Sequence, residues 1–166
     1  MQPETLIEIG TDKGGTLFVL TRVSNPHATI ISIDLYEGQF GGGYPRWRIP
    51  FYEAFSSHDQ GIYLIRENSH LPKTRQIVEK ILDGQKIDFL FVDGDHTYEG
   101  VKEDFEMYAP LVRRGGVVAF HDIVPGPTES VGGVNKFWLE IRGKYKHMEI
   151  VNDWSQGGFG IGVLYM

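Results

Sequence analysis

The stretch FVDGDHTYEG at residues 91–100 brings two carboxylates and an imidazole together at the end of an apolar run. Asp93 and His96 are the residues in it best suited to chemistry, because carboxylates bind divalent cations and imidazole exchanges protons near neutral pH. Asp95 is better interpreted as the N-cap of the helix expected to start near Thr97. The pattern predicts a reactive site where a buried strand reaches the surface.

Five short apolar runs have the composition of buried strands. They are rich in isoleucine, valine, leucine and phenylalanine and do not alternate cleanly with polar residues, which is typical of parallel strands covered on both faces. These runs are residues 5–10, 28–35, 61–68, 87–94 and 116–122. The tail differs, because the strand-like runs HMEIVND and FGIGVLYM are joined by WSQGG without a helical pattern. That order favours an antiparallel pair at one edge of the sheet.

Helical patterns separate the first five strands. Apolar residues recur at helical spacing over 77–82, 101–112 and 134–141. LVRRGG at 111–116 is interpreted as a helix end, with basic residues in the last turn and a glycine stop. The chain is thus predicted to form one α/β domain over 1–166, a doubly wound Rossmann-like sheet that is mostly parallel and ends in an antiparallel hairpin.

Polar residues follow the predicted strands at the same end of each strand. Right-handed crossovers make these strands parallel, so their ends share one edge of the sheet, where open α/β sheets bind ligands. The residues concerned are Gly10, Asp34, Glu67, Asn68, Asp93, His121 and Asp122. Any strand can end in a polar turn, but three aspartates and a histidine at one edge are more than turns require. We therefore expect a ligand site along this edge.

The turn after the first strand, EIGTDKGGT, is rich in glycine but lacks the G-x-G-x-x-G pattern of dinucleotide-binding folds. Asp12 stands in place of the second glycine, where a carboxylate would repel a pyrophosphate and suit a cationic or zwitterionic ligand. Glu8 lies inside the apolar strand and needs a partner. That partner is either the glycine turn, which Glu8 would then organise, or an ammonium group on the ligand; we favour the first.

Asp34 ends the second strand, at the position where a carboxylate can bind a ribose. Its two oxygens can accept hydrogen bonds from both hydroxyls of the diol. The alternative is a helix or turn cap. Given the predicted fold, we favour the ribose.

Three motifs resemble class I S-adenosylmethionine-dependent methyltransferases. LIEIGTDKGGT is similar to the first cofactor motif of that family and ISIDL to its ribose motif, while IDFLFVDGDHTYEGVKEDFEMYAPLVRRGGVVAFHDI carries most of the resemblance. Within the family, the chain looks like the branch that includes macrocin O-methyltransferase and cephalosporin-hydroxylase-like proteins, and more distantly like catechol O-methyltransferase. The motifs span residues 5 to about 123. The resemblance implies a Rossmann-like methyltransferase fold with S-adenosylmethionine as its cofactor.

The resemblance also implies how the cofactor lies in the site. The first turn would line its methionine end, the carboxylate after the second strand would bind the ribose, and the residues after the third strand would border the adenine. The residues predicted to bind the cofactor are Glu8, Gly10, Thr11, Asp12, Gly14, Asp34, Leu35, Asn68, Ser69 and Asp93. The unusual first turn then fits a cofactor that has no phosphate and carries a sulfonium.

Catalytic roles follow from the same resemblance. In the relatives, the first aspartate of a D-x-x-H motif is a ligand of a divalent metal and the histidine is a proposed base. Asp93 and His96 occupy these two positions. Methyl transfer to a hydroxyl needs such a base or a Lewis-acidic metal, because a hydroxyl is a poor nucleophile near pH 7. The other histidines are expected on the surface: His27, His58, His70 and His147.

His121 and Asp122 would complete a metal site with Asp93. Carboxylates suit Mg²⁺, whereas His121, in place of an expected acidic residue, suits manganese, iron or zinc better. Adjacent strand residues point to opposite faces, so His121 and Asp122 share a site only if the strand has ended. The alternative is a metal-free site in which Asp93 and Asp122 bind substrate hydroxyls.

The loop at 36–50 is predicted to form a lid over cofactor and acceptor. It contains Phe40, three successive glycines, Tyr44, Arg46 and Trp47, and glycines give mobility while aromatic rings can cover a flat or sugar-like substrate. The alternative is an ordinary flexible insertion.

The composition excludes several classes of function. A formal net charge of −6 disfavours nonspecific binding to nucleic acid or to an anionic membrane. The chain has no cysteine, which excludes disulfides and thiolate metal sites and suits the cytoplasm. MQPETLIEIG has no features of a signal peptide, and no apolar run approaches the roughly 20 residues that span a bilayer.

We therefore predict an O-methyltransferase that acts on a small hydroxylated molecule, such as a sugar or a natural-product glycoside, assisted by a base or by Mg²⁺ or another divalent metal. The alternatives are a nicotinamide-dependent oxidoreductase and a non-catalytic cofactor-binding module. Because the first strand starts by residue 5, we expect either a minimal domain or a chain from which the N-terminal helices that cover the site in relatives have been removed. An uncovered first strand favours self-association into a homo-oligomer.

Overall fold

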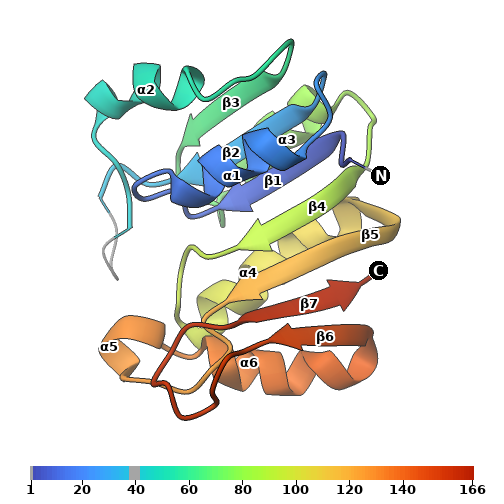
Figure 1. Cartoon of the computed structure of the whole chain (residues 1–166). Helices are drawn as coiled ribbons and strands as arrows, with labels where there is room; N and C mark the ends of the chain where they lie inside the picture. Colours follow the sequence, from blue (N-terminus) through green and yellow to red (C-terminus); the bar gives the residue numbers. More distant parts are fainter. Residues whose placement is uncertain (1, 38–41) are drawn as a thin grey trace.

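A computed structural model of the chain describes residues 2–37 and 42–166 (Figure 1). Strands and helices alternate as predicted up to the fifth strand. The strands are β1 (Thr5–Ile9), β2 (Thr29–Asp34), β3 (Gly61–Arg66), β4 (Ile87–Val92), β5 (Val112–His121), β6 (Lys146–Ile150) and β7 (Ile161–Tyr165). The α-helices are α1 (Gly15–Val23), α2 (Ile49–Glu53), α3 (Pro72–Leu82), α4 (Tyr98–Tyr108), α5 (Thr128–Val131) and α6 (Val134–Ile141), and short 3₁₀ turns cover 46–48, 109–111 and 142–144.

The strands form one twisted sheet in the order β3-β2-β1-β4-β5-β7-β6. Neighbouring strands from β3 to β5 are parallel, whereas β7 pairs antiparallel with both β5 and β6. The predicted fold class, a mostly parallel doubly wound sheet with a C-terminal antiparallel hairpin, is confirmed. This topology brings the carboxyl ends of β1 to β5 to one edge of the sheet (Figure 1).

Helices lie on both faces of the sheet, which explains the continuous apolar runs of the central strands. On one face, Leu17 and Leu20 of α1 pack against Leu6 and Ile30. On the other face, α3, α4 and α6 cover the alternate strand residues in the largest core cluster (Figure 1). Successive strand residues point to opposite faces, so both must be apolar to be buried.

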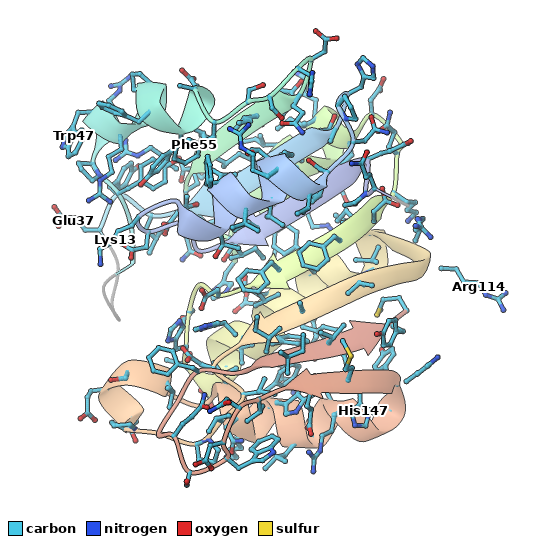
Figure 2. All side chains as sticks on the ribbon, in the orientation of Figure 1. Lys13, Glu37, Trp47, Phe55, Arg114 and His147 are labelled. Atoms are coloured by element: carbon cyan, nitrogen blue, oxygen red, sulfur yellow. The ribbon has the colours of Figure 1, made fainter. Side chains whose placement is uncertain are left out.

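The predicted helix end at 111–116 is wrong, because most of that segment belongs to β5. Helix α4 ends at Tyr108, a 3₁₀ turn follows, and β5 begins at Val112, whose side chain is buried. Gly115 has φ 76° and stands where the pairing of β5 with β4 shifts register. The glycine therefore marks an irregular strand start rather than a helix stop. Arg114 at this start projects away from the molecule (Figure 2).

The N-cap predicted for α4 is also corrected. Thr97 is the N-cap, with an extended backbone and a hydroxyl that accepts a hydrogen bond from the Gly100 amide at 2.9 Å. Asp95 instead accepts a hydrogen bond from the Thr97 amide at 2.8 Å and so orders the turn before the helix. The cap falls on the last residue that keeps an extended conformation, one residue before helical geometry begins.

Candidate active site

A cleft of about 1150 Å³ runs along the carboxyl ends of the parallel strands. It is lined by the turn after β1, the end of β2, the residues after β3, and the segments that follow β4 and β5. Asp34, Asp93 and Asp122 all line it, so the three aspartates expected at one edge do share one cleft. Its volume is slightly above the range of about 300–1,000 Å³ that is usual for a small-molecule site, which leaves room for a nucleoside and a second molecule.

The glycine turn after β1 has its shape because β1 and β4 meet closely at this edge. Gly10 has φ 92°, and a Cβ atom there would lie 2.0 Å from the carbonyl oxygen of Asp93. The carbonyl of Asp12 accepts hydrogen bonds from the Tyr52 hydroxyl at 2.6 Å and from Arg48 Nη1 at 3.1 Å. The turn is thus fixed from β4 on one side and from the α2 region on the other.

Asp34 binds the backbone of two different segments. One carboxylate oxygen accepts hydrogen bonds from the amides of Thr11 and Asp12, at 2.9 and 2.8 Å. The other accepts from the amides of Leu35 and Gly43, at 2.7 and 3.1 Å. Asp34 therefore ties the first turn to the segment that follows β2. Its ribose-binding role stays a prediction, and a diol would have to compete with these backbone donors.

Glu8 is fully buried and organises the loop through hydroxyl groups rather than through the glycine amides. One of its oxygens accepts a hydrogen bond from the Ser32 hydroxyl at 3.1 Å, and Ser32 is hydrogen-bonded in turn to the hydroxyl of Thr11. Burial raises the pKa of Glu8 to about 8, with smaller contributions from the charges of Asp93 and Asp34. At neutral pH the group is therefore mostly an uncharged acid.

The residues after β3 form the wall at the end of the cleft where the adenine was predicted. Asn68 and Ser69 line this wall, as does His70. The expectation that His70 lies on the surface is wrong: its side chain is 17% exposed and forms an ion pair with the buried Asp104. The other three histidines placed on the surface are exposed as predicted. Asp104 lies three residues after Val101 on the apolar face of its helix, a sequence signal that could have revealed the pair.

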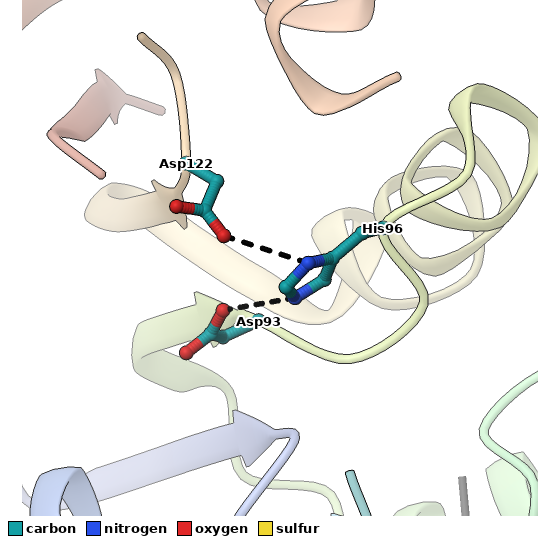
Figure 3. Close-up of side chains that lie close together, drawn as sticks. All are labelled: Asp93, His96 and Asp122. Atoms are coloured by element: carbon teal, nitrogen blue, oxygen red, sulfur yellow. Dashed lines mark ion pairs between the residues drawn. The ribbon is translucent and has the colours of Figure 1, made fainter. Parts of the chain in front are cut away.

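The reactive cluster forms where β4 and β5 end. The His96 ring lies between two carboxylates, with Nε2 3.4 Å from Asp93 Oδ1 and Nδ1 3.4 Å from Asp122 Oδ2 (Figure 3). His96 Nδ1 is also 2.9 Å from the carbonyl oxygen of Ser130. Since a carbonyl only accepts hydrogen bonds, Nδ1 carries a proton and Nε2 faces Asp93.

His121 joins this cluster because β5 ends there. Asp122 has φ 59°, which breaks the strand alternation and turns both side chains toward the cleft. His121 Nδ1 lies 3.3 Å from Asp122 Oδ1 and 3.4 Å from Asp93 Oδ1. The strand therefore ends at His121, as the sequence analysis required for His121 and Asp122 to share a site.

The cluster holds its charges in opposite-sign pairs. Hydrogen bonds to Asp122 and Asp93 raise the pKa of His121 to about 10. Burial lowers the pKa of His96, but the hydrogen bonds to Asp93 and the Ser130 carbonyl outweigh it and place the pKa above its ordinary value. Burial likewise raises the pKa of Asp93, and the two imidazoles outweigh that effect, so the net shift is downward. A cation or a proton donor is therefore well accommodated here.

Asp93, His96 and Asp122 also meet the geometric requirement for a metal site. Each offers one ligand atom, and these atoms lie within 4.8 Å of one another. The predicted set contained His121 rather than His96. His121 Nδ1 lies 3.4 and 3.3 Å from the same two carboxylates, but the geometric requirement is met by the set with His96, whose two carboxylates and one imidazole suit manganese, iron or zinc.

Sequence analysis missed the segments that close the cleft beside this cluster. The lining includes residues on α5 and in the loop between β6 and β7, among them Ser130 and Phe159. The Phe159 amide donates a hydrogen bond to Asp122 Oδ1 at 2.9 Å. The glycines of WSQGG were interpreted only as a hairpin joint, and nothing in their pattern indicated contact with Asp122.

The predicted lid at 36–50 is described only in part, and Phe40 lies outside the described residues. Glu37 and Gly42 line the cleft, and Glu37 and Lys13 lie at the same end of the molecule (Figure 2). Tyr44 is fully buried against Tyr52, with ring centroids 5.0 Å apart, so it supports the wall instead of covering a substrate.

Within the described ranges, every helix is too short or too polar to cross a bilayer.

The profile of a methyltransferase-domain family matches residues 7–123 of the chain. Two curated relatives are uncharacterized proteins of Sinorhizobium fredii and of Acanthamoeba polyphaga mimivirus, 29% and 30% identical over 144 and 146 residues. Each match covers 85% of this chain, but the chain spans only 15% and 62% of the lengths of these relatives.

Two solved structures share the fold. The O-methyltransferase TomG of Streptomyces achromogenes, in complex with SAM, superposes with a TM-score of 0.65 at 20% identity. An O-methyltransferase of Bacillus cereus, in complex with SAH, superposes with a TM-score of 0.67 at 16% identity. In both cases 99% of this chain is covered, along with 74% of the other chain. At these identities the similarity shows a common architecture.

Proposed function

Because the chain belongs to the methyltransferase-domain family whose profile covers residues 7–123, we propose that it transfers a methyl group from S-adenosylmethionine to a hydroxyl oxygen of a small molecule. The observation that carries the proposal is the joint location of two features in one cleft. One end has the glycine turn held by Asp34, and the other has the cluster of Asp93, His96, His121 and Asp122.

The cleft fits a cationic nucleoside better than a nucleotide. Its lining includes the carboxylates of Asp12, Asp34 and Glu37 at one end and those of Asp93 and Asp122, which are paired with imidazoles, at the other, against one lysine, Lys13. A sulfonium is attracted by such a wall, whereas a pyrophosphate is repelled. S-adenosylmethionine supplies an activated methyl group when bound. A nicotinamide-dependent oxidoreductase needs a dinucleotide with a pyrophosphate, and this cleft suits such a ligand less well.

On the acceptor side, the chain's own residues must orient the hydroxyl and remove its proton. The Ser130 carbonyl fixes the His96 ring through Nδ1–H, so Nε2 can take the proton of the acceptor once the proton that it shares with Asp93 has been lost. Asp93, 3.4 Å from Nε2, stabilises the imidazolium that forms. Asp122 is held by the Phe159 amide and keeps one oxygen toward His96, so it can also orient the acceptor hydroxyl.

The same donors suit assistance by a divalent metal. Asp93 and Asp122 would hold the ion together with His96 or His121. A bound divalent ion supplies Lewis acidity, which lowers the pKa of a coordinated hydroxyl. Two carboxylates and one imidazole favour Mn²⁺ over Mg²⁺.

Methyl transfer can be tested by incubating the purified chain with S-adenosylmethionine and a panel of sugars, glycosides and phenols, with and without Mn²⁺ or Mg²⁺. Mass spectrometry then measures S-adenosylhomocysteine and methylated product. We expect S-adenosylhomocysteine to raise the melting temperature and at least one hydroxylated acceptor to gain a methyl group. Cofactor binding without turnover for any acceptor would favour a non-catalytic module, and absence of cofactor binding would refute the proposal.

A further inference from the structure

One side of the sheet has no helix over four neighbouring strands. Helix α1 packs on β1 and β2, and α3, α4 and α6 cover the opposite side, so no described helix lies in front of β4, β5, β7 and β6 (Figure 1). The side chains on this surface form a core cluster that contains strand residues only: Phe89, Phe91, Val117, Ala119, Ile161 and Val163. We call this surface the open face. Parallel strands usually have both faces covered, so the open face is an exception.

Strand β6 extends the open face to the edge of the sheet. Met148 and Ile150 lie directly opposite Val163 and Ile161 of β7, and directly opposed residues of antiparallel strands point to the same face. Met148 is 44% exposed and Ile150 is 54% exposed. Lys146 lies at the margin, where its long side chain can reach water. The open face is therefore a continuous apolar surface across four strands.

The open face reaches the cluster of carboxylates and imidazoles at the ends of β4 and β5. His121 lies two residues after Ala119 on β5 and thus on the same side of the sheet. The ring centroids of His121 and Phe91 are 6.4 Å apart, and the His121 side chain is 29% exposed. A molecule that covers the open face would therefore also exclude water from this side of the cluster.

We propose that a second copy of the chain covers the open face and that the two copies pack sheet against sheet. Large contiguous apolar patches are rare on monomeric proteins and mark interaction surfaces. A flat apolar face is complementary to itself, so a two-fold axis brings apolar residues of both copies together without any matching charges. Lys146 already lies over the Tyr165 ring, so charge gives no reason for an acidic partner. This assembly does not depend on the proposed function.

The dimensions of the open face fit such a pair. Four strands about 4.8 Å apart and about five residues long present a surface of roughly 19 by 17 Å. Packed sheets lie about 10 Å apart, which is also the diameter of a helix, so the second sheet would lie in the same layer as α1. A two-fold axis along the strands would place β6 of each copy over β4 of the other and beside its α1, where Val19 and Val23 are about half exposed. With this flank of α1, the contact is near the lower size limit of specific interfaces, so we expect a Kd of about 1–100 µM.

Sedimentation equilibrium of the purified chain between about 1 and about 300 µM tests the proposal. The weight-average mass of the wild type should rise with concentration from 18.8 kDa toward twice that value. Met148→Glu should weaken association at least tenfold, because the dimer would bury a carboxylate without a partner. Leu139→Glu makes the same change at a half-exposed leucine of α6, on the other side of the sheet, and should associate like the wild type.

Two outcomes would overturn the proposal. A wild type that stays monomeric at the highest concentration would mean that a second copy does not cover the open face. Association of Met148→Glu as tight as that of Leu139→Glu would place the contact elsewhere, such as at the free edge of β6. Melting temperatures identify a variant that fails to fold, and Ile150→Glu, at another exposed position of the open face, then replaces it. None of these measurements needs the cofactor, so failure of the proposed function would leave this result unaffected.

Discussion

The two halves of the cleft use carboxylates in different ways. At the ends of β1 and β2, Asp34 accepts four backbone N–H groups at 2.7 to 3.1 Å. At the ends of β4 and β5, Asp93 and Asp122 face imidazole rings at 3.3 to 3.4 Å. Backbone amides cannot release a proton or leave, so the first half has a fixed shape. Imidazoles can exchange protons and make way for a cation, so the second half is suited to chemistry.

Glu8 on β1 is close enough to both halves for the charges of Asp34 and Asp93 to act on it. It is fully buried on β1, and the charges of both Asp34 and Asp93 contribute to raising its pKa to about 8. Because it stays protonated at neutral pH, it adds no third negative charge between them. The Glu8 carboxyl group thus acts as an uncharged hydrogen-bonding partner of Ser32, which is hydrogen-bonded in turn to Thr11.

The largest effect is expected from Asp93→Asn, which removes the charge shared by both imidazoles. Without it, each ring keeps Asp122 as its carboxylate partner and a metal loses a ligand, so methyl transfer should fall by about 10²- to 10⁴-fold. Initial rates of S-adenosylhomocysteine formation measure this. Asp59→Asn is the matched control, since Asp59 is 80% exposed and pairs with His27 on the surface. A rate within fivefold of the wild type would show that the charge of Asp93 is not needed for methyl transfer.

His96→Ala should lower kcat by about 10²-fold while the Kd for S-adenosylhomocysteine changes little. His96 is active as a base only when deprotonated, and its pKa is raised above 6.5. Wild-type turnover should therefore rise with pH through a midpoint above 6.5, and this limb should disappear in the variant. His27→Ala serves as the control. Unchanged turnover in His96→Ala would show that another group takes the proton.

Asp34→Asn tests the fixed half. An amide oxygen can still accept, but its NH₂ group must face two backbone donors, which costs about 1–3 kcal/mol for the groups left unsatisfied. The Kd for S-adenosylhomocysteine should rise about tenfold, and the melting temperature should fall by several degrees. Glu53→Gln on the exposed side of α2 is the control. An unchanged Kd would mean that the turn keeps its shape without Asp34.

The smallest effect is expected from Glu8→Gln, and it concerns the pH dependence of stability. The pKa of Glu8 is 4.5 in the unfolded chain and about 8 in the folded one, so the folded state binds the extra proton between these values. This contribution to stability is complete below about pH 4.5 and is lost as pH rises through 8. The variant should therefore lose fewer degrees of melting temperature than the wild type between pH 5 and pH 8.5. Parallel curves would place the Glu8 pKa near its ordinary value.

The sequence predicted the sheet and the edge that holds the cleft because both follow from repeated local signals. Apolar runs marked each strand of the parallel part, and the polar residue after each run marked its carboxyl end. Asp34, Asp93 and Asp122 could be brought together on topology alone. The helix end predicted at LVRRGG was wrong. Gly115 and two arginines match a helix-end pattern, but the pairing of β5 with β4 makes most of this segment a strand.

Features that depend on contacts distant in sequence were harder to predict. Asp104 on the apolar face of α4 indicated a buried partner, but nothing in the sequence identified that partner as His70, 34 positions away. Asp122, whose positive φ brings it and His121 into one site, accepts a hydrogen bond from the Phe159 amide 37 positions away, a contact that no local pattern indicates. Tyr44 was expected near a substrate and is instead packed under the wall, because burial of its ring against Tyr52 is more favourable than exposure.

The division between a fixed half that binds and a second half that reacts can be tested in one titration series. S-adenosylhomocysteine is titrated calorimetrically into the wild type, His96→Ala and Asp34→Asn under identical conditions. We predict a micromolar Kd for the wild type, a Kd within about threefold of it for His96→Ala, and binding at least tenfold weaker for Asp34→Asn. Equal losses of affinity in the two variants, or a wild type that does not bind at millimolar ligand, would contradict the account.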